Sequence, residues 1–453
     1  MKKTIAIILS SIIVMTVVLA GCGNSASNTN KDSNDVETTV EKTEEETTEP
    51  PTEALVNSYE EYNDFSDGLA WVKYNNSNGD YYGCIDKTGK MQFNVSANSV
   101  KSVKPYSNGY SYIEYESQLD VIDKKGNITK SYNSDEEHTI LAFGDGYVMT
   151  QDYKADFDSK GYTVTIYNPD GSEITSKKFD DRIPYDHFYY CGKGLFELVD
   201  QVSSQMDDDD EILFYSIAKE KWIDWEIDND FTWVNSDLKF FDENTNNALI
   251  NIYYKRDTGY NFRIIDNECN YTDYKFADYD NGIGYLWREE PYPLSESNII
   301  FNCGSDEFTG LFIYGLKDKK MITIPEKYKD KVIMEMISQP CVVDSGVFAL
   351  PLRGEDEKTY LMVFNEKWET VLEATEIESY KGFSCGRAIV NTDTETLVYN
   401  SEGKVAFNAS DLGYSDVQRY SDDVARVADQ YEPTYLDKDG KVLFEEIDDS
   451  TSY

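Results

Sequence analysis

Short apolar and aromatic runs alternate with polar turns along most of this chain. Residues 69–72 (Leu-Ala-Trp-Val) follow a turn at residues 65–68, and a second apolar run at residues 81–86 follows the polar stretch 75–79. Gly68 supplies the φ > 0 that a sharp turn needs, and the Asp before it favours the same turn. Short runs rich in apolar and aromatic residues are typical of β-strands, so the pattern predicts a β-hairpin.

The returning run of each hairpin ends in a four-residue frame with Asp or Asn first and Gly fourth. Residues 86–89 match this frame, and residues 123–126, 168–171, 400–403 and 437–440 repeat it. These residue types at these positions favour a type I turn, so the frame indicates structure and carries no chemistry of its own. The predicted turn residues are Gly68, Asp86, Gly89, Gly109, Asp123, Gly126, Gly171, Gly403, Asp437 and Gly440.

Less regular copies of the same unit fill the middle of the chain and give nine candidate units. Gly68 and Asp423 occupy equivalent positions in the first and last units, which gives an average of about 44 residues per unit. A period near forty with three or four short strands per unit is the length of a propeller blade. We therefore predict an all-β fold of tandem antiparallel repeats, a β-propeller of about seven to nine units, with an open β-repeat array as the alternative.

Residues 68–72 and 82–86, together with Gly89-Lys90, resemble the WG-containing β repeat of bacterial proteins, and residues 324–328 (Ile-Pro-Glu-Lys-Tyr) match its closing strand. The Trp of the family name is mostly replaced here by Tyr or another residue. The resemblance covers most of residues 57–453 and is strongest at both ends of that range. It implies an all-β repeat fold and brings no catalytic residues, because the family is defined by structural positions.

The N-terminus carries a positive pair, an apolar stretch and then Leu19-Ala20-Gly21-Cys22. This tetrapeptide resembles the lipobox of bacterial lipoproteins, which implies a signal peptide over residues 1–21 and a diacylglyceryl group on Cys22. An ordinary signal peptide or a transmembrane anchor is the alternative. Two acyl chains give stable anchoring, so we expect an extracytoplasmic protein on the outer face of the bacterial cell membrane.

Residues 22–56 differ in composition from the repeat domain at residues 57–453. After Cys22, the segment is rich in Ser, Thr and Glu and lacks aromatic residues. Such a composition cannot form a core, so we expect a disordered acidic linker between the lipid and the domain. As a random coil it spans roughly 30 Å, which holds the domain away from the bilayer.

The formal net charge of −43 limits the kinds of partner that the chain can bind. Nucleic acid is excluded because its recognition needs a basic surface. The charge also argues against electrostatic binding to anionic lipid, and it leaves a neutral or cationic partner, loosely held divalent cations or plain solubility.

Three candidate chemistries are weak. Gly382-Phe383-Ser384-Cys385-Gly386 matches a nucleophile elbow, but Ser384 lies in the repeat turn frame, and both histidines, His138 and His187, lie upstream of it. Asp278 and Asp280 begin like a calcium loop but lack its later glycine and glutamate, which leaves calcium as the one weak cofactor candidate. Six cysteines remain after Cys22, and we expect mostly buried, unpaired thiols, because a domain of this size needs no disulfides.

These observations predict a non-enzymatic, lipid-anchored module that binds an unknown protein or glycan at the cell surface. An extracellular carbohydrate-active propeller enzyme and a structural envelope component are the alternatives. A cluster of carboxylates with aromatic residues at the mouth of the central channel would favour the enzyme.

Overall fold

The computed structural model describes residues 61–444, without residues 77, 157–158, 180–186, 200–211, 226–230, 241–246, 255–260, 276–286, 289–291, 296–297, 306–307, 317–319, 323–346, 354–357, 366, 368 and 428–433. The chain divides into two compact units, Met1–Glu49 and Pro50–Tyr453, and every described residue belongs to the second. Within the described ranges, none of the helices is long and apolar enough to cross a membrane.

The described strands form nine antiparallel sheets in chain order. The first three sheets contain β1 (Glu61–Tyr62), β2 (Leu69–Asn76), β3 (Gly79–Asp86) and β4 (Met91–Ser96); β5 (Val100–Val103), β6 (Tyr110–Tyr115), β7 (Gln118–Asp123) and β8 (Ile128–Asn133); and β9 (His138–Gly144), β10 (Tyr147–Asp156), β11 (Ser159–Tyr167) and β12 (Glu173–Phe179). A short 3-10 turn, η1 (Ala97–Ser99), joins the first sheet to the second.

The middle sheets contain β13 (His187–Gly192), β14 (Leu195–Val199), β15 (Ile212–Ser216) and β16 (Lys221–Trp225); β17 (Phe231–Phe240), β18 (Asn247–Tyr254), β19 (Asn261–Asp266) and β20 (Tyr271–Lys275); and β21 (Trp287–Arg288), β22 (Tyr292–Ser295), β23 (Asn298–Ser305), β24 (Phe308–Gly315) and β25 (Lys320–Ile322).

The last three sheets contain β26 (Val347–Arg353), β27 (Thr359–Asn365) and β28 (Thr370–Ile377); β29 (Ser379–Ser384), β30 (Arg387–Asn391), β31 (Thr396–Asn400) and β32 (Val405–Asn408); and β33 (Val417–Ser421), β34 (Val424–Val427) and β35 (Thr434–Leu436). A second 3-10 turn, η2 (Ser410–Leu412), follows β32.

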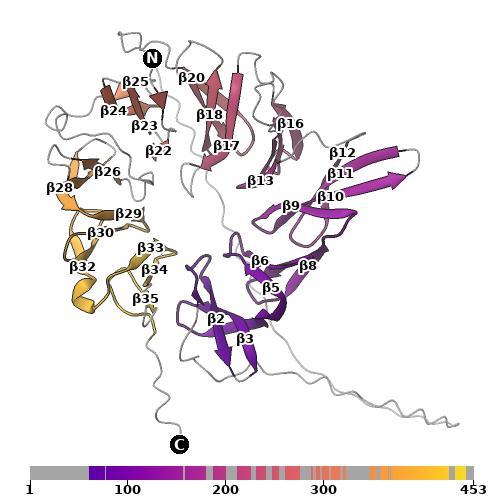
Figure 1. Cartoon of the computed structure of the whole chain (residues 1–453), viewed down its shortest axis with the longest axis horizontal. Coiled ribbons are helices and arrows are strands. Elements are labelled where there is room, and N and C mark those ends of the chain that lie inside the picture. Colours follow the sequence, from indigo (N-terminus) through magenta and orange to yellow (C-terminus); the bar gives the residue numbers. More distant parts are fainter. Residues whose placement is uncertain are drawn as a thin grey trace, which may run out of the picture. The chain divides into compact units, whose positions relative to one another are not determined.

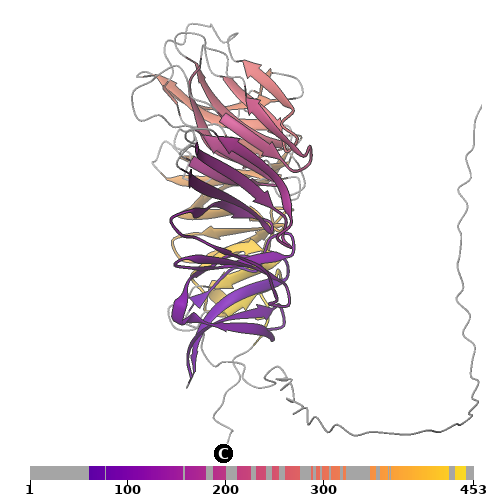
Figure 2. The ribbon, with the colours of Figure 1, turned by 90° about the vertical axis from the view of Figure 1, so that its right-hand side faces the viewer.

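The sheets follow one another around a ring, with strands such as β5, β9 and β29 towards the middle and β8, β12 and β32 towards the outside (Figure 1). Figure 2 shows the same unit from the edge. None of the nine described sheets closes on itself. Instead, the first sheet packs against the last, where Ala70 and Val72 share an apolar cluster with Val424 and Tyr435. The predicted all-β repeat fold is confirmed, and this contact between the ends favours the propeller over the open array.

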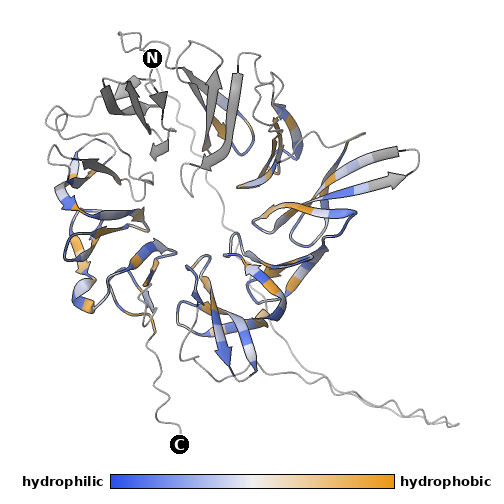
Figure 3. Ribbon diagram, viewed as in Figure 1, coloured by the Kyte–Doolittle hydropathy of each residue, from blue (hydrophilic) through white to orange (hydrophobic). Residues whose placement is uncertain are grey.

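Apolar clusters between neighbouring sheets form the core. Trp71 and Cys84 of the first sheet pack with Ile113 and Ile122 of the second. The strands in the middle of a sheet are buried on both faces, as in β14 and β15, whereas β4 alternates between half-buried and exposed residues. The apolar segments of the described strands are seen in Figure 3. This pattern is that of sheets stacked face to face, with the central strands of each sheet buried on both faces.

Several outer strands share one irregularity, a shift of register just after the strand begins. The shift lies opposite Ile85 in β4, opposite Ile122 in β8 and opposite Tyr399 in β32. Bulges twist an edge strand and interrupt its ladder of free backbone groups. The recurrence therefore protects the rim from edge-to-edge pairing with another chain.

Candidate functional site: the clasps between sheets

Where the structure describes the first turn of a unit, this turn is a tight two-residue connection. In the first sheet, Ser66 and Leu69 exchange backbone hydrogen bonds of 2.8 and 3.1 Å. Asp67 and Gly68 lie between them with φ of 55° and 84°. Two successive residues at positive φ define a type I′ turn, which suits Asp-Gly and matches the twist of the strands.

The second turn is held by its own first side chain. The N–H of Gly89 donates to the carbonyl of Asp86 at 2.9 Å, and Gly89 has φ of 78°. Oδ1 of Asp86 accepts the N–H groups of Thr88 at 2.8 Å and Lys90 at 3.2 Å. Equivalent side-chain bonds occur at Asp123, Asn400 and Asp437, and the turn glycines Gly109, Gly126, Gly171, Gly403 and Gly440 also have positive φ.

Two further second turns escaped the sequence pattern because they lack glycine. Oδ1 of Asp266 accepts the N–H groups of Glu268 and Asn270, and Cys269 has φ of 60° where the other turns have glycine. Asn365 makes the same pair of bonds. The Asp or Asn at the first position is therefore the better signal for this turn than the Gly at the fourth.

The turns of neighbouring sheets are joined by a recurring set of polar contacts, which we name the clasp. Between the first and second sheets, Oγ of Ser66 donates to the carbonyl of Tyr106 at 2.5 Å. Oδ2 of Asp67 accepts the N–H of Gly109 at 2.6 Å. Nζ of Lys124 donates to the carbonyl of Asp67 at 2.7 Å and lies 3.8 Å from its carboxylate. One Ser, one Asp and one Lys thus connect two units that are about forty residues apart.

The same clasp joins the last sheet to the first. Oγ of Ser421 donates to the carbonyl of Phe65 at 2.6 Å, and Oδ2 of Asp422 accepts the N–H of Gly68 at 2.5 Å. Nζ of Lys87 lies 2.9 Å from Oδ1 of Asp422. The repeat motif therefore continues across the ends of the domain.

The junction between the last and first sheets carries further contacts. The hydroxyl of Tyr435 donates to the carbonyl of Asn63 at 2.5 Å, and Nε of Arg426 lies 3.2 Å from Oδ1 of Asp64. The ring of Tyr435 lies 4.8 Å from that of Phe65 in an edge-to-face pair. The segment that enters the first sheet is thus held by the last.

Between the eighth and ninth sheets the clasp has different chemistry. Oγ of Ser384 donates to the carbonyl of Tyr420, as in the other clasps. Cys385 occupies the position of Asp67, and its Sγ accepts the N–H of Asp423 at 3.4 Å. Asp423 stands where the other clasps have glycine, with φ of 67°. Lys438, the counterpart of Lys124, lies 2.5 Å from Oδ1 of Asp423 instead.

Between the third and fourth sheets, a tyrosine hydroxyl bridges the carboxylate and the N–H of the turn glycine, which bond directly in the first clasp. The hydroxyl of Tyr190 donates to Oδ2 of Asp145 at 2.6 Å and accepts the N–H of Gly194 at 2.9 Å. Ser107 of the second sheet bonds to the same carboxylate. Burial raises the pKa of Tyr190 far above its ordinary value, and Asp145 adds to the shift, so this hydroxyl remains a donor.

A second contact joins neighbouring sheets farther from the middle of the ring. A Cβ on Gly126 would lie 2.5 Å from the ring of Phe93, which comes from the outer strand of the preceding sheet. Gly440 lies in the same way against Phe407. Gly89 lies against Phe444, which follows the last strand β35, so this contact also continues across the ends. The absent side chain of each glycine leaves room for the ring.

The nucleophile-elbow hypothesis is not supported at Ser384, because its hydroxyl is bonded to the Tyr420 carbonyl in a hairpin between two strands. Neither described histidine contacts it, since His138 bonds to Asp135 and the ring of His187 stacks on Tyr189. In the described part of the chain, no three His, Cys, Asp or Glu side chains are grouped to hold a metal.

Cys84, Cys269 and Cys385 have free thiols, and Sγ of Cys191 lies 3.6 Å from Oε2 of Glu197. Burial raises the pKa of Cys84 to about 12 and that of Cys269 to about 12. Cys84 is fully enclosed in the core between the first two sheets. Its thiol is therefore a packing group rather than a nucleophile.

Several predicted features lie outside the described residues. They are the lipobox with Cys22, the linker, the calcium candidates Asp278 and Asp280, and the closing strand at residues 324–328.

No protein-family model matches the chain, and no curated protein matches it. Among solved structures, a eukaryotic initiation factor is similar at 11% identity and a TM-score of 0.46, over 79% of this chain and 89% of that one. Hsv2p of Kluyveromyces lactis and Hsv2 of Kluyveromyces marxianus are each similar at 10% identity and a TM-score of 0.30, over 76% of this chain and 94% of theirs. These likenesses are too weak to inform the function.

Proposed function

We propose that this protein is a lipid-anchored binding module on the outer face of a bacterial membrane, held there through Cys22. The proposal rests first on the lipobox at residues 19–22 and on the acidic segment that follows it. Such a segment gives the domain a reach of roughly 30 Å from the bilayer. The resemblance to WG-containing repeats belongs to the same proposal.

The observation that carries the binding role is the use of the repeated polar groups inside the clasps. Ser66, Asp67 and Lys124 are all bonded across a junction, and so are Ser421, Asp422 and Lys87. Groups engaged in this way hold the sheets together and are not displayed for a reaction. The repeat therefore acts as a scaffold, and recognition falls to residues outside the motif.

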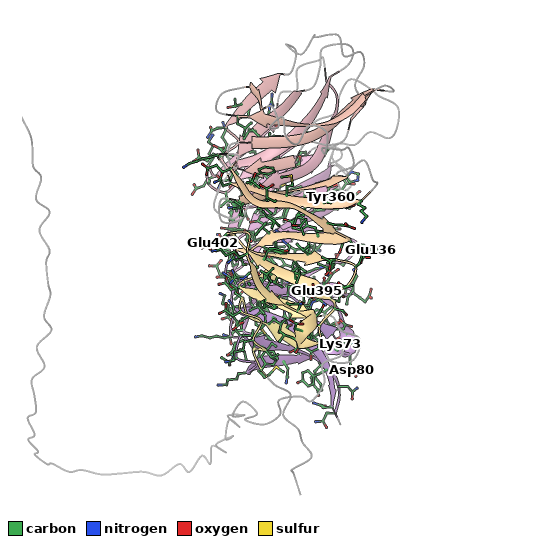
Figure 4. All side chains as sticks on the ribbon, turned by 90° about the vertical axis from the view of Figure 1, so that its left-hand side faces the viewer. Lys73, Asp80, Glu136, Tyr360, Glu395 and Glu402 are labelled. Atoms are coloured by element: carbon green, nitrogen blue, oxygen red, sulfur yellow. The ribbon has the colours of Figure 1, made fainter. Side chains whose placement is uncertain are left out.

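The clasp chemistry also suggests where a partner binds. Figure 4 shows the unit edge-on, with Glu402 of a second turn on one side and Asp80, Glu136 and Glu395 on the other. We name the first side the turn face and the second the hairpin face. The turn face is occupied by the clasps, so we expect a protein or glycan partner on the hairpin face. The net charge of −43 favours a neutral or cationic partner.

Anchoring is tested by expressing the full chain in a bacterium supplied with an alkyne fatty acid. We expect the label on the wild-type chain and its loss in Cys22→Ala, with the protein released from the membrane fraction. Cys385→Ala is the matched control and should remain labelled. An unlabelled wild-type chain, or a labelled Cys22→Ala chain, would contradict the proposal.

Binding is tested with the purified full chain by sedimentation with isolated wall material and by a glycan panel, with and without calcium. Saturable binding to either supports the module, and the binding fraction identifies a glycan or a wall-associated protein. Release of reducing ends over time would instead favour the carbohydrate-active enzyme. Absence of binding to wall, glycan and cell-surface protein fractions alike would leave the structural envelope role.

A further inference from the structure

The connector between the second and third sheets surrounds one histidine with carboxylates. Nδ1 of His138 lies 3.0 Å from Oδ1 of Asp135, and the same oxygen accepts the backbone N–H groups of Glu137 and His138, each at 2.8 Å. On the other side of the ring, Nε2 of His138 lies 3.7 Å from Oδ1 of Asp152, which belongs to β10. The imidazole therefore lies between the connector and the third sheet.

The same connector supports the base of the β10–β11 hairpin. The N–H of Tyr153 donates to the carbonyl of Glu137 at 2.7 Å. The pairing of β9 with β10 ends at His138 and Asp152, whereas β10 and β11 continue to pair as far as Asp156 and Ser159. The β10–β11 hairpin thus extends beyond the end of β9. His138 lies at that end of β9, where its pairing with β10 stops.

We propose that His138 is a proton-controlled brace that ties the connector to β10 and so sets how firmly the base of the β10–β11 hairpin is held. When both ring nitrogens carry protons, Nδ1–H donates to Asp135 and Nε2–H faces Asp152, so one cation joins two carboxylates from two elements. When the ring is neutral, only one nitrogen donates and the second link is lost. The proposal concerns the fold of the hairpin face and stands apart from the identity of any partner.

The direction of the pH dependence follows from the groups around the ring. Hydrogen bonding to Asp135 raises the pKa of His138 above its ordinary value, and Asp152 and Glu137 add to the effect. The same contact lowers the pKa of Asp135. The connector also carries Glu136, and β13, which packs on β9, begins with His187. A raised pKa means that the brace is complete below the ordinary histidine range and is lost as the pH rises through the higher folded value.

The first test is an NMR titration of the full chain in detergent micelles with 13C-labelled histidine, because the chain has two histidines. His187→Gln assigns the two signals. We expect the His138 titration midpoint to fall in Asp135→Asn and, by less, in Asp152→Asn. Asp170→Asn, in a turn of the same sheet, is the matched control and should leave it unchanged. If neither Asp135→Asn nor Asp152→Asn changes the His138 midpoint, the proposed role of His138 is wrong.

The second test reads the hairpin directly by hydrogen exchange of the Tyr153 amide, corrected for the intrinsic pH dependence of exchange. We expect its protection to fall about two- to fivefold between pH 6 and pH 8 in the wild-type chain. In His138→Gln the fall should disappear. Equal protection at both pH values in the wild-type chain would show that His138 does not control the hairpin, whatever its own titration.

Discussion

The junction between the first and second sheets and the junction between the eighth and ninth use one backbone plan with different side chains. At the first, the carboxylate of Asp67 accepts the N–H of Gly109 at 2.6 Å and attracts Lys124. At the second, the thiol of Cys385 accepts the N–H of Asp423 at 3.4 Å. A neutral sulfur is a weaker acceptor than a carboxylate and cannot pair with a lysine.

Two other contacts are the same at both junctions. The serine before the turn donates to the next sheet's aromatic carbonyl in each, from Ser66 and from Ser384. A phenylalanine of the outer strand lies on the next turn glycine in each, at Gly126 and at Gly440. The comparison indicates that the serine bond and the outer ring contact keep the sheets in place, while the carboxylate adds strength that one junction lacks.

The largest expected effect is at the outer contact. Gly126→Ala places a Cβ at positive φ and 2.5 Å from the ring of Phe93. We expect a loss of about 2–3 kcal/mol in the free energy of unfolding, from backbone strain and displacement of that ring. Gly440→Ala should cost the same, because Phe407 lies 2.7 Å from its Cβ position. Denaturant unfolding of the full chain measures both.

Gly109→Ala is the control for strain alone. Gly109 has φ of 87° and nothing within 4 Å of its Cβ position. We expect a loss of about 1 kcal/mol. If Gly109→Ala and Gly126→Ala lower the free energy of unfolding equally, the contact between Phe93 and Gly126 contributes nothing. The two junctions would then differ in stability only through their clasps.

The next largest effect on the free energy of unfolding is expected at the clasp. Asp67→Ala leaves the Gly109 N–H without its acceptor and removes the carboxylate near Lys124, which keeps its bond to the backbone carbonyl of residue 67. We expect a loss of about 1–2 kcal/mol. Cys385→Ala removes a weaker acceptor and should cost about 0.5 kcal/mol or less. Added salt should lower the cost of Asp67→Ala and leave that of Cys385→Ala unchanged, since only the first breaks an ion pair. Equal costs at both sites would mean that the two junctions are alike.

The fold could be predicted from the sequence because most units contain recognisable turn residues. Asp67-Gly68 and the Asp86 frame are local signals, and turn chemistry needs only the residues inside the turn. Their regular spacing then indicated how many sheets to expect, and the structure has nine among its described residues. The structure confirms the fold class, and these local signals are the reason that it could be predicted.

The clasps could not be predicted in the same way, because their partners are far apart in sequence. Asp67 bonds to Gly109 and Asp422 bonds to Gly68, and no local rule connects these positions. The second turn at Asp266 was missed for a different reason, since Cys269 takes the left-handed position that the pattern reserves for glycine. Residues that bond across units thus looked like ordinary turn residues.

The weaker junction can be rebuilt to sharpen the comparison. The double variant Cys385→Asp with Asp423→Gly gives the eighth and ninth sheets the residues of the first junction and frees Lys438 to reach the new carboxylate. We expect a gain of about 1 kcal/mol in the free energy of unfolding, from the stronger acceptor and the relief of φ at 67°. Adding Lys438→Met should remove part of the gain. No gain in the double variant would show that the cysteine junction is already as strong as the others.

The smallest effect changes reactivity rather than stability. Because burial raises the pKa of Cys84 and Cys269 to about 12, only about one thiol in ten thousand is ionised at pH 8 at either site. Cys385 and Cys269 are both half-buried, whereas Cys84 is fully buried. With iodoacetamide at pH 8 and peptide-resolved mass spectrometry, we expect Cys385 to be labelled well before Cys84 and Cys269, and all three to be labelled together in denaturant. Labelling of Cys84 and Cys269 should rise only as the pH approaches 12. Simultaneous labelling in the folded chain would mean that the core between the first two sheets opens as readily as the cysteine clasp, which contradicts the ranking of the two junctions.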